Sequence, residues 1–503
     1  MILWPAANVR LLEIKREKDR IFDTEINGVS ATLHAVDWLG DDENREIEAG
    51  NRTKMSFKFK KRLKDQQAYQ IRLVFREGCS IDFPPPPEVL FSGDSDRQAQ
   101  RSFITTQVGA DQLHDAGIDG SDIGVAVIDT GIWADKGRAK YLREGLYGSE
   151  RILAQYDAQA GKETSIRGNS DKNGHGSHVS SIIASSRYKR GEFNGIAPNV
   201  DLIAVRAFDA DGRGSYADVI RALDWVVSHR EQYNIRVVNQ SFSAEPQSYY
   251  WDDPLNQAVM ATWQAGIVVV ASSGNKGPNP MTVGVPGNVP YIITVGAMID
   301  NMTPNDPADD ILASFSSAGP TVEGFVKPEV VAPGGHVRGL MNKASRLAME
   351  HPLFHDGDGY YSMSGTSQST AVVSGVAALI LQADPSLSPD EVKCRIMSSS
   401  RPALDGSGHL AYSVFQQGAG MVNAYNAVYG SVASCANVGL DVDADLDGTA
   451  HFGGSANRDE NGNYYIMGLD GYLWSDGYLW SDGYLWSDSL SETASVNTWV
   501  PQQ

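Results

Sequence analysis

The chain is poor in cysteine, in positive charge and in long apolar runs. Cys79, Cys394 and Cys435 are its only cysteines in 503 residues, and so sparse and odd a set predicts neither a disulfide framework nor a cysteine metal site. No stretch approaches the roughly 18–20 uninterrupted apolar residues that a membrane-spanning helix needs. The formal net charge of −20 argues against nucleic acid and anionic membranes as partners, because its field repels phosphate groups.

The beginning of the chain also lacks a basic segment followed by an apolar stretch. The opening letters MILWPAANVR therefore show no secretory signal. We expect either a cytoplasmic protein or a chain whose leader has been removed, and the sequence does not choose between the two.

What the sequence does contain is a change of pattern along its length. Residues 1–83 alternate apolar and polar positions, as in VSATLHAV and KMSFKFKK, which predicts a small β-rich domain. Residues 84–102 open with a run of prolines and continue with polar letters, which is typical of a stiff linker. The first domain boundary is therefore expected near residue 83.

Residues 103–430 alternate apolar strand runs with helical stretches. Runs such as IGVAVIDTG and IVVVASSGN are almost wholly apolar, which indicates strands covered on both faces. Helical segments such as YADVIRALDWVVSHREQY lie between them. This order predicts an α/β domain with a doubly wound, mostly parallel sheet. Ligands of such folds bind at the carboxyl ends of the strands, so we expect the functional residues there.

Residues 431–503 form a more polar, β-like C-terminal extension. Three copies of GYLWSD span residues 471–488, and in an extended chain this period of six puts every Tyr, Trp and Asp on one face. One interpretation is an aromatic β-surface for packing or adhesion. The other, which we favour, is a strand or tail that docks on its own protein.

Four polar side chains stand in motifs that together indicate acyl transfer. Asp129 ends an apolar strand in VAVIDTGI, His175 lies between two glycines in NGHGSHVSS, and Ser367 follows a small-residue turn in MSGTSQST. Asn275 closes the run VVVASSGN. A serine nucleophile needs an imidazole to take its proton, a carboxylate to orient that imidazole, and donors for the oxyanion. Each motif alone has an ordinary structural explanation, and the combination favours catalysis.

Ser367 stands at the predicted start of an apolar helix, which leaves two interpretations of its hydroxyl. A serine at a helix start can cap the helix by accepting backbone N–H bonds. The same position supplies a backbone donor and a partial positive charge that suit a nucleophile. Asp129, His175 and Asn275 favour the nucleophile, and one helix start can serve both roles.

These motifs resemble those of the subtilisin-like serine peptidases, the subtilases. The resemblance runs from TTQVGADQLHDAGIDGSDIGVAVIDTGI, which begins at residue 105, to GAGMVNAYNAV, which ends at residue 428. It implies a subtilisin-like fold and an acyl-enzyme mechanism with Asp129, His175 and Ser367 as the charge relay and Asn275 in the oxyanion hole. It also implies that His178, the second histidine of its motif, is structural.

The resemblance further implies a groove for an extended substrate. The segment DADGRGSY matches the edge strand that pairs with a substrate backbone, and two further segments match the walls of the pocket for the residue before the scissile bond. Gln368, Ser369 and Ala371 depart from the Met-Ala and proline that commonly follow the serine, which we expect to alter packing more than chemistry. Ser243 stands where glycine is frequent and is expected to narrow or polarise the pocket. The substrate-binding residues implied in this way are Gly212, Gly214, Tyr216, Ser241, Phe242, Ser243, Ala271, Ser272, Ser273 and Gly274.

Two acidic segments are candidates for a calcium site, and the chemistry itself requires no cofactor. Asp443, Asp445 and Asp447 begin a D-x-D-x-D-G calcium loop, but Gly454 stands where the bidentate glutamate should be. A solvated acidic turn explains the same letters. The stretch DNMTPNDPADD at 300–310 is a second oxygen-rich candidate. Structural calcium is common in the family that the chain resembles.

The leading hypothesis is a serine endopeptidase that cuts extended polypeptide, because an edge-strand groove recognises backbone. One alternative is an inactive scaffold or carbohydrate-binding protein on a degenerate peptidase core, and another is an esterase or amidase for small molecules. Subtilases often carry a cleaved N-terminal folding chaperone and are commonly secreted. Autoprocessing of residues 1–100 from a zymogen would give an active form beginning near Ser102.

Overall fold

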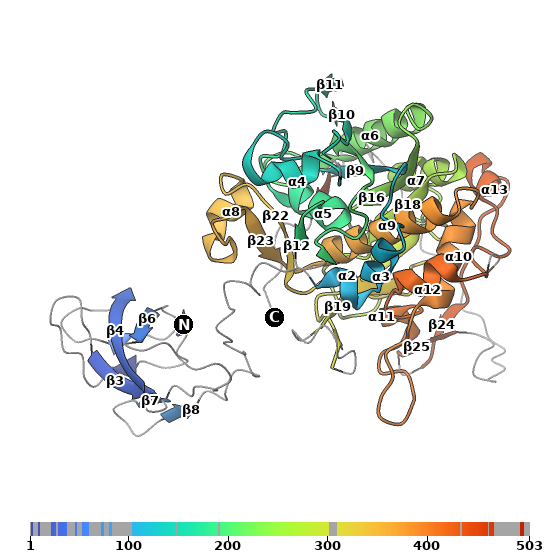
Figure 1. The fold of residues 1–503 in the computed structure, drawn as a ribbon. Coiled ribbons are helices and arrows are strands. Elements are labelled where there is room, and N and C mark those ends of the chain that lie inside the picture. The colour runs from blue at the N-terminus through green and yellow to red at the C-terminus, as the bar shows by residue number, and fades with distance from the viewer. Residues whose placement is uncertain are drawn as a thin grey trace. The chain divides into compact units, whose positions relative to one another are not determined.

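The computed structural model consists of two compact units, Met1–Arg101 and Ser102–Gln503, and each is described by itself (Figure 1). In the first unit only the backbones of the strands are described. In the second, the described residues are 103–146, 148–189, 192–300, 309–432, 435–460, 462–466 and 493–496.

The first unit contains antiparallel strands in the region where the sequence alternates apolar and polar letters. Its largest sheet has the order β1-β6-β4-β3, and β2 pairs with β5 and β7 with β8. The strands are β1 (Ile2–Leu3), β2 (Val9–Arg10), β3 (Phe22–Ile26), β4 (Val29–Asp37), β5 (Glu46–Ile47), β6 (Thr53–Phe59), β7 (Arg72–Val74) and β8 (Ser80–Asp82).

A nine-stranded, mostly parallel sheet forms the centre of the second unit, which confirms the predicted α/β fold class. Its order is β11-β10-β14-β9-β16-β18-β19-β20, with β21 also paired to β19. Only the pairs β10–β11 and β19–β20 are antiparallel among the described strands of this sheet. The strands are β9 (Gly124–Asp129), β10 (Ile152–Asp157), β11 (Lys162–Thr164), β14 (Asp201–Arg206), β16 (Ile235–Gln240), β18 (Val268–Ser272), β19 (Ile293–Ile299), β20 (Ile311–Leu312) and β21 (Val330–Pro333).

Helices cover the sheet. Every residue of β9 and β18 is buried, as expected for strands with both faces covered. Helices α5 and α9 pack on each other and on the central strands, and α6 and α7 form a second pair on the sheet (Figure 1). The helices are α2 (Ile104–Gln107), α3 (Ala110–Asp115), α4 (Lys140–Arg143), α5 (His175–Ala184), α6 (Tyr216–Ser228), α7 (Pro254–Gln264), α8 (Arg346–Glu350), α9 (Thr366–Ala383), α10 (Pro389–Ser399), α11 (Val414–Gln417), α12 (Ala424–Tyr429), α13 (Val442–Asp447), η1 (Gly137–Ala139) and η2 (Pro352–Phe354).

The sequences of α6 and α9 explain their different positions. Helix α6 buries Val219, Leu223 and Val226, which recur at three- and four-residue steps, so only one stripe of it faces the core. Helix α9 is buried all the way from Thr366 to Leu381. Small and apolar side chains on every side allow α9 to cross the middle of the domain, and its first residues therefore start inside the protein.

Short strands form smaller sheets in the same unit. Two-stranded ribbons are formed by β12 with β13, β22 with β23, and β24 with β25, whereas β15, β26 and β17 make a three-stranded sheet. Their bounds are β12 (Tyr188–Lys189), β13 (Glu192–Phe193), β15 (Arg213–Ser215), β17 (Phe242–Ser243), β22 (Val337–Leu340), β23 (Tyr360–Met363), β24 (Ala456–Arg458), β25 (Tyr464–Ile466) and β26 (Thr493–Val496).

The described part of the C-terminal extension packs on the same unit and corrects one expectation. A disulfide joins Cys394 of α10 to Cys435, with 5.2 Å between their Cα atoms. The prediction of a fold without disulfides was wrong, because 41 residues of separation along the chain say nothing about proximity in space. The GYLWSD repeats at 471–488 lie outside the described residues. Among the described helices, none is long and apolar enough to cross a membrane.

Candidate active site

The four predicted residues come from the carboxyl ends of two parallel strands of one sheet and from the starts of two helices. Asp129 is the last residue of β9, and Asn275 follows the end of β18. His175 is the first residue of α5, and Ser367 is the second residue of α9. Because β9, β16 and β18 are parallel neighbours, their carboxyl ends meet at one edge of the sheet, where functional residues are expected.

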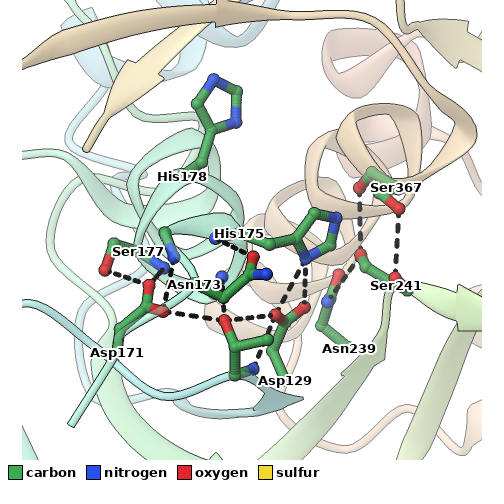
Figure 2. A network of polar contacts seen from close by, with 12 residues as sticks. Asp129, Asp171, Asn173, His175, Ser177, His178, Asn239, Ser241 and Ser367 are labelled. Atoms are coloured by element: carbon green, nitrogen blue, oxygen red, sulfur yellow. Dashed lines mark hydrogen bonds and ion pairs between the residues drawn. The ribbon is translucent and has the colours of Figure 1, made fainter. Parts of the chain in front are cut away.

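Asp129 and His175 form a fully buried pair. The Nδ1 atom of His175 lies 2.8 and 2.9 Å from the two carboxylate oxygens of Asp129. A carboxylate only accepts hydrogen bonds, so Nδ1 carries the proton and Nε2 of the neutral ring is left as the acceptor. The Nε2 atom is buried without a hydrogen-bond partner among the described residues. Figure 2 shows this nitrogen on the side of the ring that faces Ser367.

Two glycines allow the histidine to reach this position. Gly174, which precedes α5, has a φ of +107°, a conformation that side chains rarely adopt. A Cβ atom on Gly176 would lie 2.3 Å from the carbonyl oxygen of Gly131, in the turn after β9. The first turn of α5 therefore approaches the end of β9 closely, and this brings His175 to Asp129.

Asp171 is a residue of this site that sequence reasoning missed. Its buried carboxylate accepts hydrogen bonds from Gly174 N at 2.7 Å, Ser177 N at 2.8 Å and Thr130 Oγ1 at 2.9 Å (Figure 2). Burial raises the pKa of Asp171, and the hydrogen bonds from Ser177 and Gly174 oppose that rise. Asp171 thus connects the turn after Asp129 to the first turn of α5. The sequence feature that could have indicated Asp171 is its position four residues before His175 in DKNGHG.

His178 points away from Asp129, on the other side of α5 (Figure 2). Its Nε2 lies 3.0 Å from the carbonyl oxygen of Tyr361, and burial lowers its pKa to about 3. A ring that stays neutral and hydrogen-bonded to the backbone is a packing element, which agrees with the structural role implied for it. Gln368 lies beside it, with Nε2 at 3.5 Å from His178 Nδ1. The glutamine that follows the serine therefore contacts the second histidine, and Ala371 is buried in the core.

Ser367 is held by two reciprocal hydrogen bonds to Ser241. The hydroxyl of Ser367 donates to the carbonyl oxygen of Ser241 at 3.0 Å, and the hydroxyl of Ser241 donates to the carbonyl oxygen of Ser367 at 3.0 Å (Figure 2). Asn239, near the end of β16, donates to the Ser241 hydroxyl at 2.9 Å. Gly365, not Ser367, stands at the N-cap of α9. The hydroxyl of Ser367 therefore bonds to the neighbouring strand segment and is not the helix cap.

Asn275 is oriented by Thr366, the residue before Ser367. Its Oδ1 accepts hydrogen bonds from Thr366 N at 3.0 Å and from Thr366 Oγ1 at 2.8 Å. Both bonds fix the amide so that Nδ2 points elsewhere, and Nδ2 is buried without a partner in the described part of the chain. A buried amide donor of this kind beside a serine is suited to receive an oxyanion.

The two segments matched to a substrate groove lie on either side of a third strand. Gly214 of β15 and Phe242 of β17 are both buried, and neither strand pairs directly with the other among the described residues, because β26 lies between them. A Cβ atom on Gly214 would lie 2.5 Å from the carbonyl oxygen of Ala207, so this edge requires glycine. Phe242 packs on Phe208, with 5.0 Å between ring centroids.

The predicted pocket walls are brought together, and Tyr216 is turned inward. A Cβ atom on Gly274 would lie 3.5 Å from the hydroxyl of Ser243, so the two predicted walls face each other. The hydroxyl of Ser273 is buried without a partner among the described side chains, whereas that of Ser272 donates to Phe242 O at 2.9 Å. Tyr216 is fully buried at the start of α6.

The structure differs from the predicted calcium loop. Residues 442–447 form helix α13, and Asp441 caps it by accepting from the backbone N–H groups of Asp443 and Ala444. Asp445 is buried and already accepts hydrogen bonds from Tyr250, Tyr291 and His451. These residues do not fit a calcium ion. The described chain contains no group of three or more His, Cys, Asp or Glu residues suited to a metal, and residues 301–308 of the second acidic candidate lie outside it.

The chain is similar to a known protein family and to several known proteins. A family model described as the subtilase family matches residues 120–429. The serine protease AprX of Bacillus subtilis is 37% identical over 319 residues, which cover 62% of this chain and 67% of that protein. Subtilisin DY of Bacillus licheniformis is 30% identical over 318 residues, covering 63% of this chain and 94% of the relative. A solved structure named S41 psychrophilic protease aligns with a TM-score of 0.49 at 25% identity, over 61% of this chain and 92% of its own.

Proposed function

The chain belongs to the subtilase family and is a serine endopeptidase, and from that premise we propose how it cuts extended polypeptide. Asp129, His175 and Ser367 act as the charge relay, and Asn275 with the backbone N–H of Ser367 binds the oxyanion. The proposal is supported most directly by two buried nitrogens that lack partners in the described chain, His175 Nε2 and Asn275 Nδ2. The first can accept the proton of Ser367, and the second can donate to a new oxyanion.

The first half of the reaction forms an acyl-enzyme. Ser367 Oγ attacks the carbonyl carbon of the scissile bond while its proton passes to His175 Nε2, and Asp129 stabilises the imidazolium. The oxyanion receives hydrogen bonds from Asn275 and from the start of α9. When the intermediate collapses, the C–N bond breaks and His175 returns its proton to the departing amine. Water then attacks the ester by the same steps, and His175 again acts first as base and then as acid.

The Ser367 hydroxyl has to turn for the first step. It donates to the carbonyl oxygen of Ser241 at 3.0 Å, whereas His175 Nε2 accepts from no described group. Rotation about one side-chain bond moves Oγ without moving the backbone. Catalytic hydrogen bonds often form only when substrate is bound, so this arrangement fits a resting enzyme.

The proposal is tested by replacing the nucleophile. Ser367→Ala should abolish hydrolysis of a peptide amide while thermal unfolding stays close to that of the wild type. Ser398→Ala, which changes an exposed serine of α10, is the matched control and should keep full activity. Substantial hydrolysis by a folded Ser367→Ala protein would contradict the assignment.

We also propose that residues 1–100 are removed by autoprocessing. The boundary between the two compact units, at Arg101 and Ser102, supports this because a cut there leaves the second unit whole. The active form should then begin near Ser102. Intact mass measurement of active enzyme tests it, and activity in a chain that still carries Met1 would reject it.

A further inference from the structure

Strand β26 occupies the groove between the two strands matched to substrate binding. It is the central strand of the sheet β15-β26-β17 and is antiparallel to both neighbours. Ser495 pairs with both Arg213 and Ser243, and Val496 N donates to Gly212 O at 3.1 Å. The backbone groups that would bind an extended peptide are therefore engaged by a segment of the same chain.

The side chains of β26 alternate between buried and exposed positions. Ala494 is 0% exposed and Val496 is 1% exposed, and both belong to the main hydrophobic core of the unit. Ser495 between them is exposed. Two apolar subsites, one filled by an alanine and one by a β-branched side chain, are thus separated by a solvated position. This is the pattern that a strand-like peptide presents to a groove.

The direction of β26 carries it toward the proposed nucleophile. The strand begins with Thr493 opposite Ser215 and ends with Val496 opposite Phe242. Phe242 directly follows Ser241, whose carbonyl oxygen accepts the hydrogen bond of Ser367. The acyl side of a bound peptide must run along this groove from its amino end to the scissile carbonyl at the serine. Strand β26 runs in the same direction.

We propose that β26 is a built-in competitor of substrate, with Thr-Ala-Ser-Val lying where the acyl side of a peptide must lie. This inference rests on the proposed function and adds its regulation and its substrate preference. Peptides enter only when β26 leaves. The favoured substrates carry a small apolar residue and, two positions later, a β-branched apolar residue, as Ala494 and Val496 do, with a tolerant position between them.

The test compares two full-length variants in which the same substitution is made at adjacent positions of β26. Ala494→Asp puts an unpaired carboxylate into a buried subsite, which is unfavourable and should expel the strand. Ser495→Asp introduces the same charge at the exposed position and is the matched control. The assay is steady-state hydrolysis of a peptide anilide with Ala and Val in the two subsites.

Expulsion of a competitor lowers KM and leaves kcat unchanged. A tethered segment at an effective concentration of about 1 mM, with a dissociation constant of about 0.1 mM, raises KM roughly tenfold. Ala494→Asp should therefore lower KM about tenfold, and Ser495→Asp should match the wild type. Acetyl-Thr-Ala-Ser-Val-amide added to the Ala494→Asp protein should inhibit it competitively, whereas the peptide with Asp in place of Ala should not.

The failure of this inference is distinct from the failure of the proposed function. Equal KM values for wild type and Ala494→Asp, in proteins that hydrolyse the anilide, would overturn the inference alone. An Ala494→Asp protein that folds but neither hydrolyses the anilide nor reacts with a fluorophosphonate at Ser367 would overturn both.

Discussion

Two buried aspartates of this protein each bind a histidine, and only one of the two pairs has the arrangement that the proposed mechanism requires. Asp129 lies 2.8 Å from His175 Nδ1, and Asp445 lies 2.9 Å from His451 Nδ1. Around Asp445, the hydroxyls of Tyr250 and Tyr291 also donate to the carboxylate. Burial raises the pKa of both tyrosines, so these hydroxyls stay protonated and act as donors.

The two pairs differ in the surroundings of the histidine ring. The ring of His451 stacks on Trp251, with 4.8 Å between centroids and 8° between planes, and its side chain is 35% exposed. The ring of His175 is fully buried, and its Nε2 faces Ser367 without a partner among the described residues. A buried Asp–His pair alone is therefore not sufficient to indicate a catalytic site. A buried acceptor on the side of the ring that faces a serine makes the first pair a candidate for catalysis (Figure 2).

Replacing each of the two aspartates by asparagine should give the largest difference in kcat/KM between the two pairs. Asp129→Asn leaves His175 without its carboxylate and should lower kcat/KM by about 10⁴-fold, a magnitude known from other serine peptidases including subtilisin. Asp445→Asn should leave kcat/KM near the wild-type value and lower the free energy of unfolding instead. Steady-state kinetics and urea unfolding of both variants measure the contrast, which would collapse if Asp445→Asn lost activity to a similar degree.

The oxyanion donor should give the next largest effect. Asn275→Leu removes the unpartnered Nδ2 and should lower kcat by about 10²–10³-fold with little change in KM, the size known for the corresponding asparagine of subtilisin. Thr366→Val removes one of the two hydrogen bonds that orient Asn275 and should lower kcat by a smaller factor. A loss confined to KM would show that Asn275 binds substrate and not the transition state.

The sheet, and the position of the four predicted catalytic residues at its carboxyl edge, could be predicted from the sequence for a physical reason. Wholly apolar strands such as β9 and β18 indicate two covered faces, and parallel neighbours end at one edge. Asp129, which ends one such strand, and Asn275, which follows another, are therefore brought to the same edge. Glycine-rich turns precede the helices that carry His175 and Ser367.

Three features could not be predicted because each depends on contacts between distant segments. The disulfide requires α10 to pack on the segment around Cys435. The letters around Asp445 fit a calcium loop and a capped helix equally well, and only the tyrosines and His451, brought in by the fold, decide between them. The place of β26 could not be predicted from a β-like extension alone, because the strands that it pairs with lie more than 200 residues away along the chain.

His178 should give a pH effect on stability and not on catalysis. Its pKa falls from 6.5 to about 3 on folding because it is buried. Between those values the unfolded chain binds the proton and the folded chain does not, so stability falls as pH is lowered through this window, by up to about 1.4 kcal/mol per pH unit. His178→Gln should reduce this slope in urea unfolding at several pH values. An unchanged slope would mean that His178 does not stay neutral in the folded protein.

Loss of one hydrogen bond to Asp445 should have the smallest effect, and it should change stability alone. Tyr291→Phe removes one donor from Asp445 while those from Tyr250 and His451 stay in place. It should lower the free energy of unfolding by about 1 kcal/mol and leave kcat/KM unchanged. A change in kcat/KM without a loss of stability would give the Asp445 cluster a functional role.

The central claim is that His175, held by Asp129, activates Ser367 as a nucleophile. The most direct measurement is the rate of labelling by a fluorophosphonate, with the labelled residue located by mass spectrometry, in wild type, Asp129→Asn and Asp445→Asn. We predict a single label on Ser367, slowed at least a hundredfold in Asp129→Asn and unchanged in Asp445→Asn. Equal rates in the three folded proteins, or a label on another residue, would contradict the claim.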